Sequence, residues 1–312
     1  MEPAPDAVDE GYEHAAYRGR LDDVSLPRTS MSTWERWSSD RRWQWFGAFD
    51  GRTAVGGALV DVGWFGSMFV WTFDRLSREM TSEDFLLPAG VFEVTDDDTH
   101  GVVARLDLPG KRFNVHRSGE QVHVTAVSSE QDVRLKFDVS GTEALTAVCP
   151  AGSRSRHVDL TEKHAGVGVS GRVVTPEFER VLSGVGGLDY SHGLLPRRTQ
   201  WRWAMGFDGS EDGGLAFNLT EGYTGGVENA VWVDGVPCSV GRASFEFDGS
   251  IRVTSDCGVV DVLLDVEAVR ADDIDVCLLE SSYRQPLGVW RGELAGREFE
   301  GAGVAERHIA RW

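Results

Sequence analysis

Most of this chain consists of short segments that alternate apolar and polar residues, and this period of two constrains its fold more than any other feature. Val122–Val127 and Val133–Val139 are clear examples. Such alternation is typical of half-buried β-strands, because successive side chains point to opposite faces. Turn pairs that favour positive φ separate the segments, as at Asp50-Gly51, Ser118-Gly119 and Asp234-Gly235. The pattern predicts an all-β protein of roughly twenty strands, in antiparallel sheets that are closed or sandwiched.

Helix is expected to be scarce, and its best candidate is residues 175–183. Thr175 suits the N-cap, Pro176 the first helical position and Gly184 the stop. The glycine-rich stretch 184–187 is interpreted as a hinge or a connector between domains, because glycine weakens a strand interior. A chain of 312 residues is long enough for two domains. We therefore expect an N-terminal arm at 1–30, a first β-barrel domain at 31–180 and a second β-barrel domain at 181–312.

The net charge of the chain limits the classes of partner that it can bind. It carries 31 Lys+Arg against 50 Asp+Glu, a formal charge of −19. Nucleic acids and anionic membranes require a positive face, so neither is expected as a partner. The apolar runs are far shorter than the ~20 residues of a membrane-spanning helix. The N-terminal residues lack the apolar core of a secretory signal, which predicts a cytoplasmic protein.

Two residue types bear on the chemistry. The lysines are three, Lys111, Lys136 and Lys163, and none follows residue 188, where the motifs gather, so Schiff-base catalysis is not expected. Tryptophan is dense in the first domain. There it can fill a barrel core or wall a ligand cavity, and both interpretations stay open for Trp34, Trp37, Trp43, Trp45, Trp64 and Trp71.

The densest unusual segment runs from Asp189 to Trp203. A turn there could bring Asp189 and His192 together as an acid–base pair, or the two could be a turn cap and a surface residue. Alternation then places Trp201 and Trp203 on one face, together with Arg197 and Thr199, and Arg198, Gln200 and Arg202 on the other. Whichever arginine faces a cavity, Arg197 or Arg198, would hold an anionic ligand.

Further polar residues stand at strand positions where they are disfavoured. Glu228 shares a face with Trp232, which suits either acid–base work or an ion pair with an arginine. Glu306 and His308 point to one side of a C-terminal strand and form a second candidate pair, or simply close a barrel. The remaining candidates for substrate binding are Asn218, Asn229, Trp232, Tyr283 and Gln285, and Glu306 and His308 are expected to contact the substrate too. Zinc-ligand spacing, a phosphate-binding loop and a dinucleotide fingerprint are missing, so we expect neither a metal nor another cofactor.

These motifs carry a resemblance to a known family. The strings are DxxHGxxPRRTxWxW (189–203), NLxxG (218–222), ENxxWVDG (228–235), QPxG (285–288) and GVxExHxAxW (303–312). They resemble the bacterial domain of unknown function 2804, which is related to AttH-like and hydroxyneurosporene-synthase-like proteins. The resemblance implies two lipocalin-like β-barrels with very little helix. It also implies a pocket that positions a small molecule and transfers protons, as in a carotenoid hydratase, fungal cyclases and proteins that close aziridine rings.

We therefore expect a cofactor-independent enzyme of small-molecule metabolism that performs elimination, hydration or intramolecular cyclisation, with loss of an anionic leaving group. Its partner would be a small anionic or polar metabolite. Asp189, His192 and Glu228 are the proton-transfer candidates, while Trp201, Trp203 and Asn229 would orient the substrate. The alternatives are a lipocalin-like carrier without catalysis and a structural protein. A homo-oligomer or a small protein partner also stays open.

Overall fold

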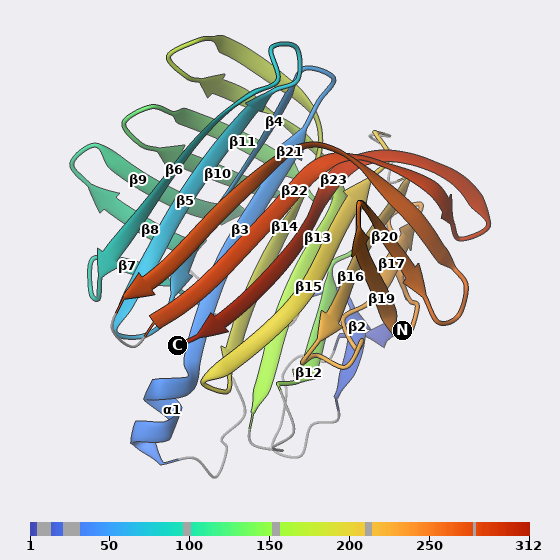
Figure 1. Ribbon diagram of the computed structural model, residues 1–312, viewed down its shortest axis with the longest axis horizontal. Helices are drawn as coiled ribbons and strands as arrows, with labels where there is room; N and C mark the ends of the chain where they lie inside the picture. The colour runs from blue at the N-terminus through green and yellow to red at the C-terminus, as the bar shows by residue number, and fades with distance from the viewer. Residues whose placement is uncertain (5–13, 21–31, 96–100, 152–156, 210–213, 277–278) are drawn as a thin grey trace.

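The computed structural model describes residues 1–4, 14–20, 32–95, 101–151, 157–209, 214–276 and 279–312. Within these ranges the chain is all-β, as predicted, and a single short helix, α1 (Thr33–Ser39), is described. No described helix has the length and apolarity that crossing a membrane requires. Figure 1 shows the strands of the second sheet, coloured yellow to red, lying across the blue and green strands β3, β13 and β14 of the first.

The first sheet forms a nearly closed antiparallel barrel of 11 strands. Its strand order is β6-β5-β4-β3-β14-β13-β11-β10-β9-β8-β7. The bounds are β3 (Asp40–Phe49), β4 (Thr53–Asp61), β5 (Phe65–Asp74), β6 (Glu79–Pro88), β7 (Phe92–Val94), β8 (Val102–Leu108), β9 (Lys111–Ser118), β10 (Gln121–Val127), β11 (Asp132–Asp138), β13 (Val158–Val174) and β14 (Glu179–Leu194).

Three short strands extend this sheet beside β13. They are β1 (Glu2–Pro3), β2 (Ala15–Arg18) and β12 (Leu145–Pro150), and β12 pairs with both β13 and β2. The described parts of the N-terminal arm, predicted at 1–30, thus add strands to the first sheet. The other residues of that arm, 5–13 and 21–30, lie outside the described ranges.

The second sheet is a curled half-barrel of nine strands, ordered β18-β17-β16-β15-β23-β22-β21-β20-β19. Its bounds are β15 (Arg198–Phe207), β16 (Leu215–Gly222), β17 (Ala230–Val233), β18 (Val236–Ser239), β19 (Ala243–Asp248), β20 (Ser250–Ser255), β21 (Val260–Val276), β22 (Leu279–Leu294) and β23 (Arg297–Arg311). The turn between β17 and β18 uses Asp234 and Gly235, both at positive φ, as the sequence predicted.

The chain passes from the first sheet to the second between Leu194 and Arg198. The boundary expected at 180/181 therefore falls inside the β13–β14 hairpin. The predicted helix at 175–183 is wrong. Thr175 caps a tight turn instead, because its hydroxyl accepts hydrogen bonds from the backbone N–H groups of Glu177 and Phe178, and β14 begins at Glu179.

The hinge predicted at 184–187 is also wrong, because these glycines lie inside β14. At Gly187 the missing side chain allows the two sheets to approach each other closely, and it does not serve flexibility. A Cβ on Gly187 would lie 2.6 Å from the sulfur of Met205 and 2.9 Å from the ring of Phe207, both on β15 of the other sheet. This contact lets the two sheets pack around a shared apolar layer that includes Trp71, Met205 and Leu287.

Replacing Gly187 by Ala should destabilise the fold by roughly 1–3 kcal/mol, because the new methyl group overpacks the layer between the sheets. The free energy of unfolding in urea measures this. Gly168→Ala on β13 is the matched control, since nothing lies within 4 Å of a Cβ there. Equal stability of the two variants would show that Gly187 is not needed for the approach of the sheets.

Candidate active site between the two sheets

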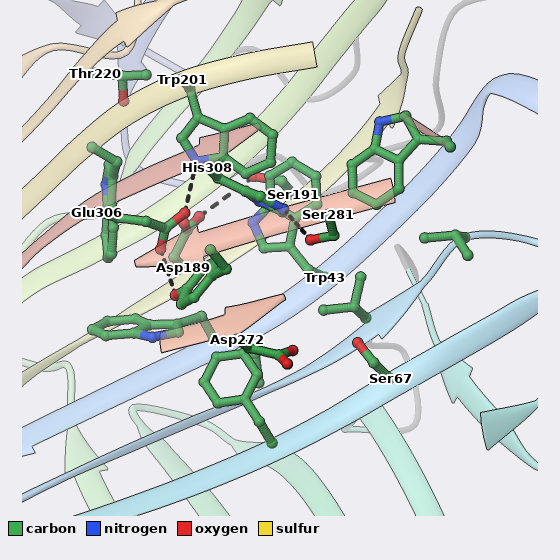
Figure 2. A pocket seen from close by; sticks show the side chains of 18 of the residues that line it. Trp43, Ser67, Asp189, Ser191, Trp201, Thr220, Asp272, Ser281, Glu306 and His308 are labelled. Carbon is green, nitrogen blue, oxygen red and sulfur yellow. Dashed lines mark hydrogen bonds between the residues drawn. The ribbon is translucent and has the colours of Figure 1, made fainter. Parts of the chain in front are cut away.

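A cavity of about 130 Å³ lies between the two sheets. Strands β3, β4, β5, β13 and β14 line it from the first sheet, and β15, β16, β21, β22 and β23 from the second. Its walls are mostly apolar and include five indole rings, from Trp43, Trp45, Trp201, Trp203 and Trp312. Figure 2 shows Asp189, Glu306 and His308 gathered around one space beside Trp201. The site is therefore shared by both sheets.

The cavity floor, as we call Lys163, Asp189 and Glu228, is an ion-paired triad that joins the sheets. Lys163 stands directly opposite Asp189 on neighbouring strands, and its Nζ lies 2.8 Å from Asp189 Oδ1 and 3.0 Å from Glu228 Oε2. Glu228 comes from the second sheet, just before β17. Burial acts to lower the pKa of Lys163, but the two carboxylates outweigh it and hold that pKa above its usual range.

Glu306 on β23 carries the carboxyl group best suited to proton transfer. Trp201 Nε1 donates to Oε1 at 2.7 Å, and the Tyr283 hydroxyl donates to Oε2 at 2.6 Å. Burial raises the pKa of Glu306 to about 7; the two hydrogen bonds oppose this rise, and the negative charge of Asp189 adds to it. Both protonation states are therefore accessible near neutral pH.

His308 lies two residues further along β23 and lines the same cavity. One ring nitrogen, Nε2, lies 2.8 Å from the Ser281 hydroxyl, and the ring meets Trp201 edge-on at 4.3 Å between centroids. Burial, with a contribution from Arg270, lowers the pKa of His308 to about 3. The imidazole is thus neutral at pH 7 and serves as a hydrogen-bonding group.

The arginine in this cavity is Arg270 on β21, which the sequence did not single out. Its guanidinium is 3.8 Å from the ring centroid of Phe69 and 4.8 Å from that of Tyr283. It pairs closely with Asp84 and lies 3.9 Å from Asp272. The sequence contains no signal for Arg270, because its position opposite Gln285 is apparent only from the pairing of β21 with β22.

Seven of the predicted site residues line the cavity: Asp189, Glu228, Trp201, Trp203, Tyr283, Glu306 and His308. The tryptophans of β15 face inward, as one of the two predicted arrangements required. The first-domain tryptophans were expected either to fill a core or to wall a cavity, and the structure contains both kinds. Trp43 and Trp45 wall the cavity and Trp71 belongs to the core, whereas Trp34, Trp37 and Trp64 are exposed.

Four further predicted residues lie behind the wall and support it. Asn218 accepts from Trp203 Nε1 and donates to the Glu228 carbonyl, which fixes both groups. Gln285 accepts from Trp71 and donates to the Tyr283 hydroxyl. Asn229 bonds the backbone of Thr220, and Trp232 is a core residue whose indole donates to the Glu143 carbonyl. None of the four lines the cavity.

His192 does not join Asp189. The two residues belong to one continuous strand, β14, and a spacing of three places them on opposite faces. His192 Nε2 lies 3.1 Å from Asp40 Oδ1 instead, where β3 begins, and His192 does not line the cavity. The predicted pairing assumed a turn at a place where the strand runs on.

Arg197 and Arg198 are both exposed and hold nothing in the cavity. Arg198 lies on the outer face of β15 with Gln200 and Arg202, and Arg197 precedes the strand. The expectation of an anionic ligand rested on these two residues, and the structure removes that support.

Lys163 lies in the cavity although no lysine was expected there, because no lysine follows residue 188. The β13–β14 pairing carries it to Asp189 across 26 residues of chain. Its ion pairs keep the amine protonated and therefore a poor nucleophile. Two more lining residues were missed, Asp159 and Tyr223, whose hydroxyl lies 3.2 Å from Asp159 Oδ2. Among the described residues no cluster of three His, Cys, Asp or Glu is placed to hold a metal ion.

Replacing Lys163 by Met should cost roughly 3–5 kcal/mol of stability, because it leaves two buried carboxylates without their cation. Urea denaturation measures the loss. Lys136→Met is the control on half-exposed β11 and should change stability by less than about 0.5 kcal/mol. A small effect at Lys163 would mean that the triad is well hydrated.

Glu306 should make stability depend on pH. Its pKa rises from an ordinary 4.5 to about 7 in the fold, so the folded state binds more protons than the unfolded state between these values. Stability is therefore lost as pH rises through that interval, by roughly 3 kcal/mol. Glu306→Gln removes this loss and should gain stability relative to the wild type between pH 5 and pH 8. The exposed Glu298→Gln on β23 should follow the wild type at both pH values.

Comparison with solved structures supports the double-barrel architecture. Kievitone hydratase from Nectria haematococca superimposes with a TM-score of 0.57 at 7% identity, covering 93% of this chain and 95% of that chain. CghA gives 0.57 at 12% identity, with 95% and 98% covered. An AttH-type protein from Nitrosomonas europaea gives 0.53 at 12% identity, with 86% and 92% covered. These identities establish a common fold alone.

Comparison by sequence places the chain in a family. No curated protein matches it. The model of one family, described as a domain of unknown function, DUF2804, matches residues 13–312. That match spans both sheets and every residue of the cavity. The chain belongs to the DUF2804 family.

Proposed function

We propose that this protein is an acid–base enzyme that converts a small metabolite held between its two sheets, by hydration, elimination or intramolecular cyclisation. The proposal rests on the position of Glu306: its carboxyl group is buried, lines the cavity and has a pKa of about 7. A group with such a pKa can both give and take a proton at neutral pH, which is the requirement for general acid–base catalysis.

The surroundings of Glu306 suit a two-step proton transfer. In the first step Glu306 gives its proton to the substrate, at a double bond or a leaving group. The hydrogen bonds from Trp201 and Tyr283 then stabilise the carboxylate that remains, one on each oxygen. In the second step a carboxylate of the cavity, Asp189 or Glu306 itself, takes up the proton that the added water, the neighbouring carbon or the attacking group of the substrate releases. Trp201 and Trp203 pack against the substrate and hold it beside Glu306.

The comparisons support this proposal only through the fold. One neighbour is a hydratase by name, so this architecture houses that chemistry elsewhere. The reaction of this chain must come from its own site. The competing function is ligand binding without catalysis, for which the aromatic walls of the cavity would be sufficient.

A conversion assay tests the proposal. The purified protein is incubated with a metabolite extract of its source organism, and mass spectrometry follows compounds that gain or lose a water or a leaving group. Wild type and Glu298→Gln should convert the same compound, and Glu306→Gln should be at least ~100-fold slower. The wild-type rate should fall as pH rises through about 7, because Glu306 must be protonated for the first step.

Two results would contradict this. Conversion by Glu306→Gln at the wild-type rate would remove Glu306 from the mechanism. Reversible retention of a compound without any conversion would indicate a binding protein.

A further inference from the structure

Carboxyl groups outnumber cations around the cavity. Five carboxyl side chains line it, Asp159, Asp189, Glu228, Asp272 and Glu306, against two cations, Lys163 and Arg270. Both cations are already engaged. Lys163 pairs with Asp189 and Glu228, and Arg270 pairs with Asp84 and Asp272. The floor triad therefore has two carboxylates for one ammonium group, and no lining cation is left for an anionic ligand.

Two oxygens of the floor are unused. Asp189 directs all its side-chain hydrogen bonds through Oδ1, which receives Lys163, Thr161 and Ser191, so Oδ2 has no partner among the described residues. Glu228 contacts Lys163 through Oε2, and no hydrogen bond from the described part of the chain reaches Oε1. Asp189 is 6% exposed and Glu228 is 4% exposed, and both line the cavity. Unpaired carboxylate oxygens at such depth are costly unless a donor meets them.

A third acceptor stands nearby. The Thr220 hydroxyl, from the second sheet, is buried, lines the same cavity and has no hydrogen-bond partner in the described ranges. Asp189, Glu228 and Thr220 thus each present an oxygen without a hydrogen-bond partner in the described ranges, and Asp159 Oδ1 is a fourth such oxygen among the lining residues. Burial raises the pKa of Asp159, so the first three are the acceptors best suited to the three N–H donors of a primary ammonium group.

The acids beside the floor respond to its negative charge. Burial raises the pKa of Asp159 well above its ordinary value, and the charge of Glu228 is the next cause. Tyr223 and Cys149 shift in the same direction, again with burial first and with Glu228 contributing. Both effects favour the neutral form of Asp159, so this group adds little to the negative charge of the floor.

The walls complete the environment that a cation prefers. Lys163 already lies 5.9 Å from the ring centroid of Trp203, so that indole face points to the floor. Trp45 meets Trp203 edge-to-face at 5.0 Å between centroids, and Trp201 lies two residues away on the same face of β15. Aromatic faces attract cations and also pack against hydrocarbon.

From these contacts we infer that the substrate is a primary amine with an apolar body, bound as its ammonium ion to Asp189 Oδ2, Glu228 Oε1 and the Thr220 hydroxyl. The body of the molecule lies against the tryptophans, within reach of Glu306. This inference rests on the proposed function of the same site, and it replaces an anionic ligand by a cationic one.

Three probes of similar shape and different charge test the inference: 2-phenylethylamine, 2-phenylethanol and 3-phenylpropanoate. Titration calorimetry at pH 7 should show the amine binding roughly tenfold or more tighter than the alcohol, and the carboxylate binding weakest. The advantage of the amine should vanish at a pH above the pKa of its own ammonium group. Equal or tighter binding of the alcohol or the carboxylate would overturn the inference, as would the absence of binding by all three probes at millimolar concentration.

A variant locates the amine. Glu228→Gln should weaken 2-phenylethylamine roughly tenfold and leave 2-phenylethanol unchanged, and the retained alcohol affinity shows that the cavity is intact. Glu298→Gln should change neither affinity. If Glu228→Gln does not fold, the wild-type ranking of the three probes still decides. Failure of this test leaves the conversion assay with Glu306→Gln unaffected, so the two proposals can fail separately.

Discussion

The Lys163 ammonium group, clamped between Asp189 of one sheet and Glu228 of the other, is the interaction on which the rest of the site depends. It is buried, and it spans the place where the two sheets face each other. Removing one member of such a triad would leave an uncompensated charge in a dry interior. The two sheets are therefore held in one relative position at the cavity, while the apolar layer around Trp71 and Met205 seals the remainder of their contact.

A shared cavity of this kind changes the chemistry of its acids. Glu306 and its hydrogen-bond donors Trp201 and Tyr283 belong to the second sheet, whereas the carboxylate that acts on it, Asp189, belongs to the first. Bringing them together removes water from the carboxyl group and adds a like charge, and both effects raise its pKa. The site is thus a product of the packing of the two sheets.

The sequence predicted what is local. Alternation and turn pairs gave the strands, and period two placed Trp201 with Trp203 and Glu306 with His308. It failed where strand continuity mattered. Thr175-Pro176 looks like a helix start, yet it forms the turn of the β13–β14 hairpin. The glycines at 184–187 look like a hinge, yet they lie inside β14, where Gly187 permits contact between the sheets. Asp189 and His192 do not meet because β14 continues through both of them. Lys163 and Arg270 were missed because their roles depend on pairing between distant strands.

The central claim is that both sheets tune a single site, and the titration of Glu306 tests it most directly. Nuclear magnetic resonance of the ¹³C-labelled carboxyl group should give a pKa of about 7 in the wild type. It should give a lower value in Asp189→Asn, in which the charge from the other sheet is gone. A wild-type pKa near the ordinary 4.5 of a glutamate, or one that does not respond to Asp189→Asn, would contradict the account.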